Sequence, residues 1–106
     1  MDFLPYTAVT TGGEAYRVNF PLHPETRAPD QVADMLNEVL GSLGDIIDNR
    51  EGVSDGDVLQ ALTMAIAIRA KMVKAPLSAS EQLLGQLLGD ALEAVEEATP
   101  QATGHA

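Results

Sequence analysis

An acidic segment in the middle of the chain has residue types that could bind a divalent metal ion. It covers residues 45–57 and lies between two stretches with helical periodicity, which is the order of elements in a calcium-binding EF-hand. An EF-hand loop needs oxygen ligands at fixed positions around a glycine at its sixth residue. With Gly56 at that position, the third residue is Val53 and the twelfth is Leu62. With Gly52 there, the first residue is an isoleucine. We therefore expect a solvated turn whose carboxylates cap the next helix, and no metal site.

Residues for nucleophilic catalysis or zinc binding do not form a known pattern in this sequence. The two histidines, His23 and His105, stand far apart, one in a proline-rich stretch and one near the C-terminus. The chain has no cysteine, which excludes a disulfide, a thiolate ligand and a cysteine nucleophile. No serine or threonine has a histidine or lysine at the spacing of a known nucleophile motif. We expect a protein without enzymatic activity, catalytic residues, metal or cofactor.

Arg69 is the charged residue with the most unusual predicted surroundings. Helical periodicity places it on an apolar face, between Leu62, Ala65 and Val73. A buried guanidinium needs a carboxylate partner. Two interpretations stay open. Arg69 either extends outward or pairs structurally, or it is a buried charge that holds an anionic ligand or a subunit contact.

One predicted helix carries carboxylates along the face opposite its apolar stripe. Like charges one turn apart destabilise a helix, and no lysine is interleaved with them. This acidic face is either simply solvated or a candidate interaction surface for a basic partner. Its residues are Asp30, Asp34, Glu38, Asp45 and Asp48.

Alternating residues near the N-terminus predict a β-hairpin over about residues 6–20. Tyr16 and Val18 begin a run in which apolar and polar residues alternate, and this period of two is typical of a strand. The pair Gly12-Gly13 suits a turn with positive φ angles. A two-residue loop at that pair would place Val9 opposite Tyr16 and Thr7 opposite Val18.

Three stretches with apolar residues every three or four positions predict helices at about residues 29–50, 55–74 and 79–98. Ser54 with Asp57, and Ser78 with Glu81, have the spacing of capping boxes for the last two helices. The second helix is apolar around most of its circumference, so we expect it to be the most buried. The predicted fold is α+β and helix-dominated, with one domain over residues 1–99 and a flexible tail over residues 100–106.

Composition limits the partners of this protein. The net charge of −10 among 106 residues repels nucleic-acid phosphates and anionic membranes. No apolar stretch is long enough to span a bilayer, and a small domain without cysteine is typical of a reducing compartment. We expect no direct nucleic-acid contact, no membrane association and a cytoplasmic location.

Glycines inside the predicted helices have two possible explanations. Gly41, Gly44, Gly85 and Gly89 each lower helix stability relative to alanine. A close approach of another backbone would offset that cost, either within the domain or at the seam of a homodimer.

Taken together, the residues favour a small acidic interaction or regulatory protein that is not an enzyme and that forms a homodimer. An alternative function is an acidic inhibitor or nucleic-acid mimic that occupies a basic surface of a nucleic-acid-handling protein. A third is a ligand-binding or enzymatic domain that uses the region around Arg69, which requires a pocket with convergent polar groups.

Overall fold

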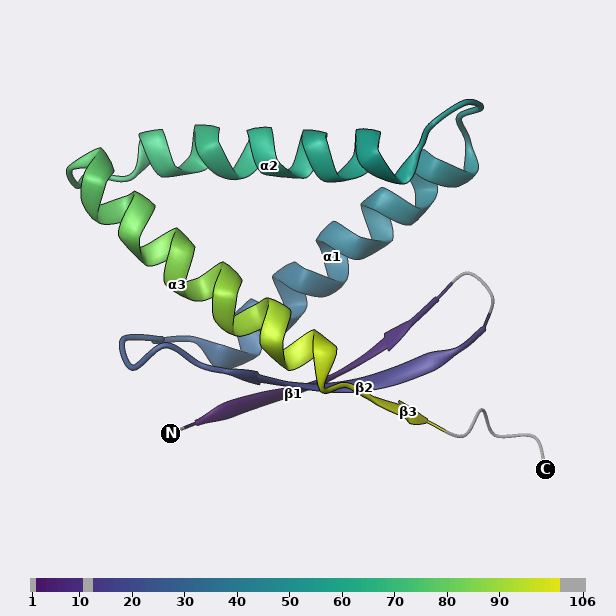
Figure 1. The fold of residues 1–106 in the computed structure, drawn as a ribbon, viewed down its shortest axis with the longest axis horizontal. Coiled ribbons are helices and arrows are strands. Elements are labelled where there is room, and N and C mark those ends of the chain that lie inside the picture. Colours follow the sequence, from purple (N-terminus) through teal and green to yellow (C-terminus); the bar gives the residue numbers. More distant parts are fainter. Residues whose placement is uncertain (1, 11–12, 102–106) are drawn as a thin grey trace. The chain divides into compact units, whose positions relative to one another are not determined.

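The structure of the protein is a computed structural model that describes residues 2–10 and 13–101. It confirms the α+β, helix-dominated fold, with a hairpin followed by three helices (Figure 1). Its contacts divide the chain into two units. The sheet unit comprises Met1–Ala33 and Gly85–Ala106, and the helical unit comprises Asp34–Leu84. The single domain over residues 1–99 stays a prediction.

The hairpin pairs β1 (Phe3–Val9) with β2 (Ala15–Pro21) in a register one residue away from the predicted one. Tyr6 lies opposite Val18, and Val9 lies opposite Ala15 rather than Tyr16. The turn explains the difference. The N–H of Gly13 donates to the Thr10 carbonyl at 2.9 Å, and Gly13 has a φ of +84°. A glycine at positive φ after a tight turn adds a residue to a hairpin loop, and the register shifts with it.

The corrected register places the apolar residues of both strands on one face. Leu4 and Tyr6 of β1 are half-buried, and Val18 of β2 is only 4% exposed. The backbone pairs Asp2–Leu22 and Thr10–Glu14 are hydrogen-bonded. In an antiparallel ladder every second pair is hydrogen-bonded, so the even-numbered residues of β1 make the backbone hydrogen bonds to β2. The ring nitrogen of Pro5 therefore faces the outer edge of the sheet, where a missing N–H costs no ladder bond.

A third strand, β3 (Thr99–Gln101), pairs antiparallel with β2 and completes a sheet of order β1-β2-β3 (Figure 1). Pro100 lies opposite Tyr16, and Gln101 lies opposite Ala15. The prediction of a flexible tail beginning at residue 100 is therefore wrong for these two residues. Pro100 is accepted in this strand because β3 lies at the edge of the sheet.

The three helices are α1 (Pro29–Asp48), α2 (Asp55–Met72) and α3 (Leu77–Glu96), each within a few residues of its predicted bounds. The capping box of Ser54 and Asp57 is confirmed. The one expected at Ser78 is not formed, because α3 begins at Leu77 and Ser78 lies in its first turn. Within the described ranges, none of the helices combines the length and the apolarity that a bilayer crossing requires.

The prediction that α2 is the most buried helix is wrong for the single chain. Ile66 is 44% exposed, Ile68 is 58% exposed and Leu59 is 65% exposed, whereas Ala70 is buried. The wide apolar surface of α2 was read as a sign of burial, but the other helices of the helical unit leave it uncovered. Only small side chains are buried in this unit, namely those of Ala70 and Ser80.

Candidate interaction surface

The helical unit has an open apolar groove with a volume of about 460 Å³. All three helices of the unit contribute to its lining, which is almost entirely hydrocarbon. We call it the helical groove. Its lining residues are Val39, Leu62, Ala65, Ile66, Arg69, Ala70, Val73, Ser80, Leu83 and Leu84.

Arg69 lies in the helical groove but is exposed rather than buried in the single chain. Its Nη1 donates a hydrogen bond to the sulfur of Met72 at 3.5 Å, and the structure assigns it no carboxylate partner among the described residues. A thioether is a weak acceptor that leaves the positive charge uncompensated. The sequence placed Arg69 correctly among apolar residues, but it did not show that this face would stay open to solvent.

The acidic face of α1 is solvated in the single chain. The carboxylates of Asp30, Asp34, Glu38, Asp45 and Asp48 all belong to exposed residues. Asp30 lies in the first turn of α1, where it complements the positive end of the helix dipole. Exposure is common to a solvated face and to a docking face, so binding of a basic partner at this face stays a prediction.

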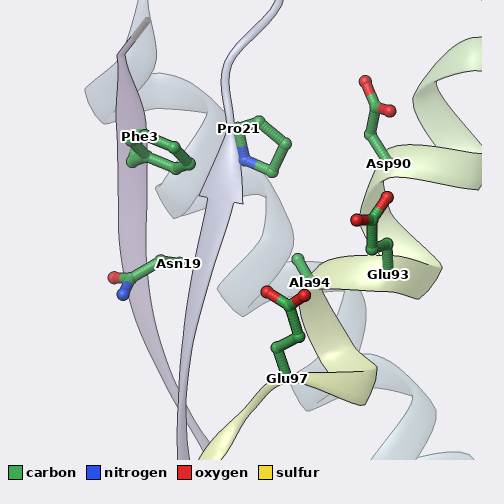
Figure 2. A pocket seen from close by; sticks show the side chains of 7 residues that line it. All are labelled: Phe3, Asn19, Pro21, Asp90, Glu93, Ala94 and Glu97. Carbon is green, nitrogen blue, oxygen red and sulfur yellow. The ribbon is translucent and has the colours of Figure 1, made fainter.

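A second and smaller pocket lies in the sheet unit and has a volume of about 270 Å³. Figure 2 shows the strand residues Phe3, Asn19 and Pro21 on one side of it, and residues of α3 on the other. The lining residues on that side are Asp90, Glu93 and Ala94 of α3, and Glu97, which directly follows the helix. Its three carboxylates repel anions and have no metal-binding arrangement, because within residues 2–10 and 13–101 no three potential ligands lie close enough to hold an ion.

The histidines are not brought together by the described structure. The Nδ1 atom of His23 accepts a hydrogen bond from the backbone N–H of Glu25 at 3.2 Å, which closes a turn before α1. His105 lies outside the described residues. The loop of residues 49–54 contains Gly52 at a φ of +79°, and its last residue, Ser54, is the predicted N-cap of α2.

One side-chain pair near the hairpin turn has altered acid–base behaviour. The phenol of Tyr16 donates a hydrogen bond to Oε2 of Glu14 at 2.9 Å. This bond, and the repulsion between the carboxylate and a phenolate, raise the pKa of Tyr16 above its usual value of 10.0. The hydrogen bond is exposed to solvent and local, because Glu14 precedes Tyr16 by two residues.

The glycines of α1 and α3 are not explained by close packing in the described chain. A Cβ atom placed on Gly41, Gly44, Gly85 or Gly89 would meet no other described atom within 4 Å, once the helix's own backbone is set aside. The interpretation that these residues allow close approach inside the chain is therefore not supported. The seam of a homodimer remains as the other interpretation.

Comparison with known proteins gives no further guide to the function. No protein-family model matches the chain, and neither a curated protein nor a solved structure shows a significant match.

Proposed function

We propose that this protein is a non-enzymatic interaction protein of the cytoplasm that works as a homodimer. The observation that carries this proposal is the exposure of large apolar side chains on all three helices. The buried hydrophobic residues among those described are Val18, Ala70 and Ala94, and no large side chain is fully buried. A folded domain derives most of its stability from burying such side chains, so a further surface has to cover them.

The test is the mass in solution over a wide range of concentration. Sedimentation equilibrium or light scattering from micromolar to submillimolar protein should give twice the chain mass of 11.2 kDa. The thermal unfolding midpoint should rise with protein concentration, because mass action couples folding to association. A monomer across the whole range, with a midpoint independent of concentration, would contradict the proposal.

The exposed carboxylates of α1 favour a second candidate function. An acidic helix on a chain of net charge −10 could occupy a basic surface of a nucleic-acid-handling protein. Reversing two of these charges, as in Asp34→Lys with Glu38→Lys, should then abolish salt-sensitive capture of that basic partner. Loss of capture with the homodimer mass unchanged would support this function, and unchanged capture would contradict it.

A ligand-binding or enzymatic role for the Arg69 region has less support. Such a role requires convergent polar groups in a concave site. The helical groove is concave, but its polar groups are limited to Arg69 and Ser80. A guanidinium and a hydroxyl on an apolar wall can orient a carboxylate, but they do not form an acid–base pair.

A further inference from the structure

We infer that the helical groove binds an amphiphile with one carboxylate and an unbranched hydrocarbon chain, the chemical class of a fatty acid. The groove takes the hydrocarbon chain, and Arg69 and Ser80 bind the carboxylate. The groove's volume of about 460 Å³ is typical of small-molecule sites, which are mostly apolar and have a few polar groups that orient the ligand. This site goes beyond the proposed homodimer and does not depend on it.

Basic residues of this acidic chain gather beside the groove. Arg69, Lys71 and Lys74 are three of its six lysines and arginines, and no acidic residue lies between Asp57 and Glu81. Most of the groove lining comes from this stretch of the chain. The local charge is therefore opposite to the net charge of −10, and it complements an anionic ligand.

Arg69 is the basic residue that meets the ligand. It lines the groove, whereas Lys71 and Lys74 do not. Within the described part of the chain its hydrogen-bond acceptor is the sulfur of Met72 at 3.5 Å, and a thioether leaves the charge of the guanidinium unbalanced. A carboxylate accepts two parallel hydrogen bonds from a guanidinium. The head group of a fatty acid therefore supplies the acceptor and the single negative charge that Arg69 lacks in this chain.

The hydroxyl of Ser80 is a second and independent sign of a polar ligand. Ser80 lies in the first turn of α3 and is 8% exposed. The described residues give its hydroxyl no hydrogen-bond partner. No side-chain oxygen in residues 2–10 and 13–101 is both enclosed and unpaired, so this hydroxyl is open to the groove that Ser80 lines. An unpaired hydroxyl in an apolar wall is costly, and a carboxylate oxygen accepts its hydrogen bond.

The rest of the groove suits the hydrocarbon chain of such a ligand. All lining residues other than Arg69 and Ser80 are apolar. Val39 of α1, Ile66 of α2 and Leu83 of α3 are exposed, so these walls are in contact with water when the groove is empty. Each methylene that enters the groove should strengthen binding by up to about fourfold. Binding, unlike catalysis, needs no acid–base pair, so two polar groups are sufficient.

The first experiment titrates the purified full chain with laurate by isothermal titration calorimetry, below the concentration at which laurate forms micelles. We expect one laurate per chain. Octanoate, which is shorter by four methylenes, should bind about tenfold more weakly or worse, and acetate should not bind. Dodecyltrimethylammonium has a similar chain and a positive head group. The net charge of −10 attracts this cation, so a preference for laurate reports the site and not the charge of the whole protein.

Matched substitutions test the two polar groups. Arg69→Gln should weaken laurate binding by about tenfold or more. Lys71→Gln removes the same charge outside the groove lining and should change binding by less than about threefold. Ser80→Ala should weaken binding by about threefold or more, whereas Ser78→Ala, in the same turn but outside the lining, should leave it unchanged.

A further pair of variants tests the groove itself. Ala65 lines the groove and Ala67 does not, and both are exposed residues of α2. Ala65→Phe should fill the groove and abolish laurate binding, whereas Ala67→Phe should bind laurate as the wild type does. Because both alanines are exposed, both variants should keep the helical circular dichroism of the wild type.

The contrary outcomes are equally specific. Binding of dodecyltrimethylammonium as tight as that of laurate, or equal losses in Arg69→Gln and Lys71→Gln, would overturn the carboxylate contact. Laurate binding that persists in Ala65→Phe, or binding to phosphatidylglycerol vesicles in place of laurate, would overturn the groove as the site. The mass in solution is read separately. A monomer that binds laurate would overturn only the proposed homodimer, and a dimer that binds no laurate would overturn only this inference.

Discussion

Ser54 and Asp57 cap α2 through two reciprocal hydrogen bonds. Oγ of Ser54 accepts from the backbone N–H of Asp57 at 3.1 Å, and Oδ2 of Asp57 accepts from the backbone N–H of Ser54 at 3.1 Å. Two backbone donors at the start of the helix are satisfied in this way, although water competes for them at this exposed position.

Removing this cap should destabilise the protein, and Ser54→Ala should lower the free energy of unfolding by about 1 kcal/mol. Ser78→Ala is the matched control, because Ser78 has the same sequence spacing to an acid but lies inside the first turn of α3. We expect the control to change stability by less than about 0.5 kcal/mol. Urea denaturation measures the free energy of unfolding of both variants. Equal losses would contradict the assignment of Ser54, and not Ser78, as a helix cap.

Two glycines around the same loop should respond in opposite directions to alanine. Gly52 has a φ of +79°, which an alanine adopts at a cost of about 1–2 kcal/mol. Gly56 lies in the first turn of α2, and a Cβ there would be 3.7 Å from Oγ of Ser54, an ordinary contact. Gly56→Ala should therefore stabilise the protein by about 0.4–1 kcal/mol. Thermal unfolding tests both, and a stabilising Gly52→Ala would contradict the loop conformation.

The Tyr16–Glu14 pair predicts a change in tyrosine titration. Its pKa is raised in the folded protein, so the stability it contributes is present below pH 10 and is lost as pH rises through the higher folded value. Glu14→Gln removes the repulsion and should lower the pKa of Tyr16 toward 10.0. Ultraviolet titration in a Tyr6→Phe background isolates the signal. An unchanged pKa would mean that the hydrogen bond to Glu14 does not persist in solution.

Ile66 should matter far more to the dimer than to the single chain. It is 44% exposed in the chain itself, so Ile66→Ala should cost under about 1 kcal/mol where the protein is dissociated. At concentrations where the proposed homodimer covers this face of α2, the loss should approach the roughly 2–5 kcal/mol of a core truncation. Thr63→Ala, on an exposed part of α2, is the control. A cost of Ile66→Ala that does not depend on concentration would contradict this prediction.

The helices could be predicted from the sequence, because their bounds depend on residues that are close to one another along the chain. The helix bounds follow from apolar residues at steps of three and four, and from a local signal, the Ser54–Asp57 cap of α2. These signals act over one or two turns and therefore survive in any tertiary context. The acidic residues of α1 and the absence of an EF-hand pattern were likewise read from spacing alone.

The register of the hairpin was predictable in principle but was predicted wrongly. The pair Gly12-Gly13 indicated a turn, but not the number of residues in it. Pairing the apolar residues Leu4 and Tyr6 with Phe20 and Val18 would have selected the observed register, because a shift of one residue turns every side chain of β1 to the other face.

The sequence by itself determined the hairpin and the three helices, that the chain is acidic, and that α2 is apolar around most of its circumference. Only the tertiary structure decided that Pro100 and Gln101 join the sheet, that Arg69 lines an open groove, and that α2 stays exposed in the single chain. The physical reason is that periodicity records which face of a helix is apolar, whereas burial depends on which distant segment covers that face.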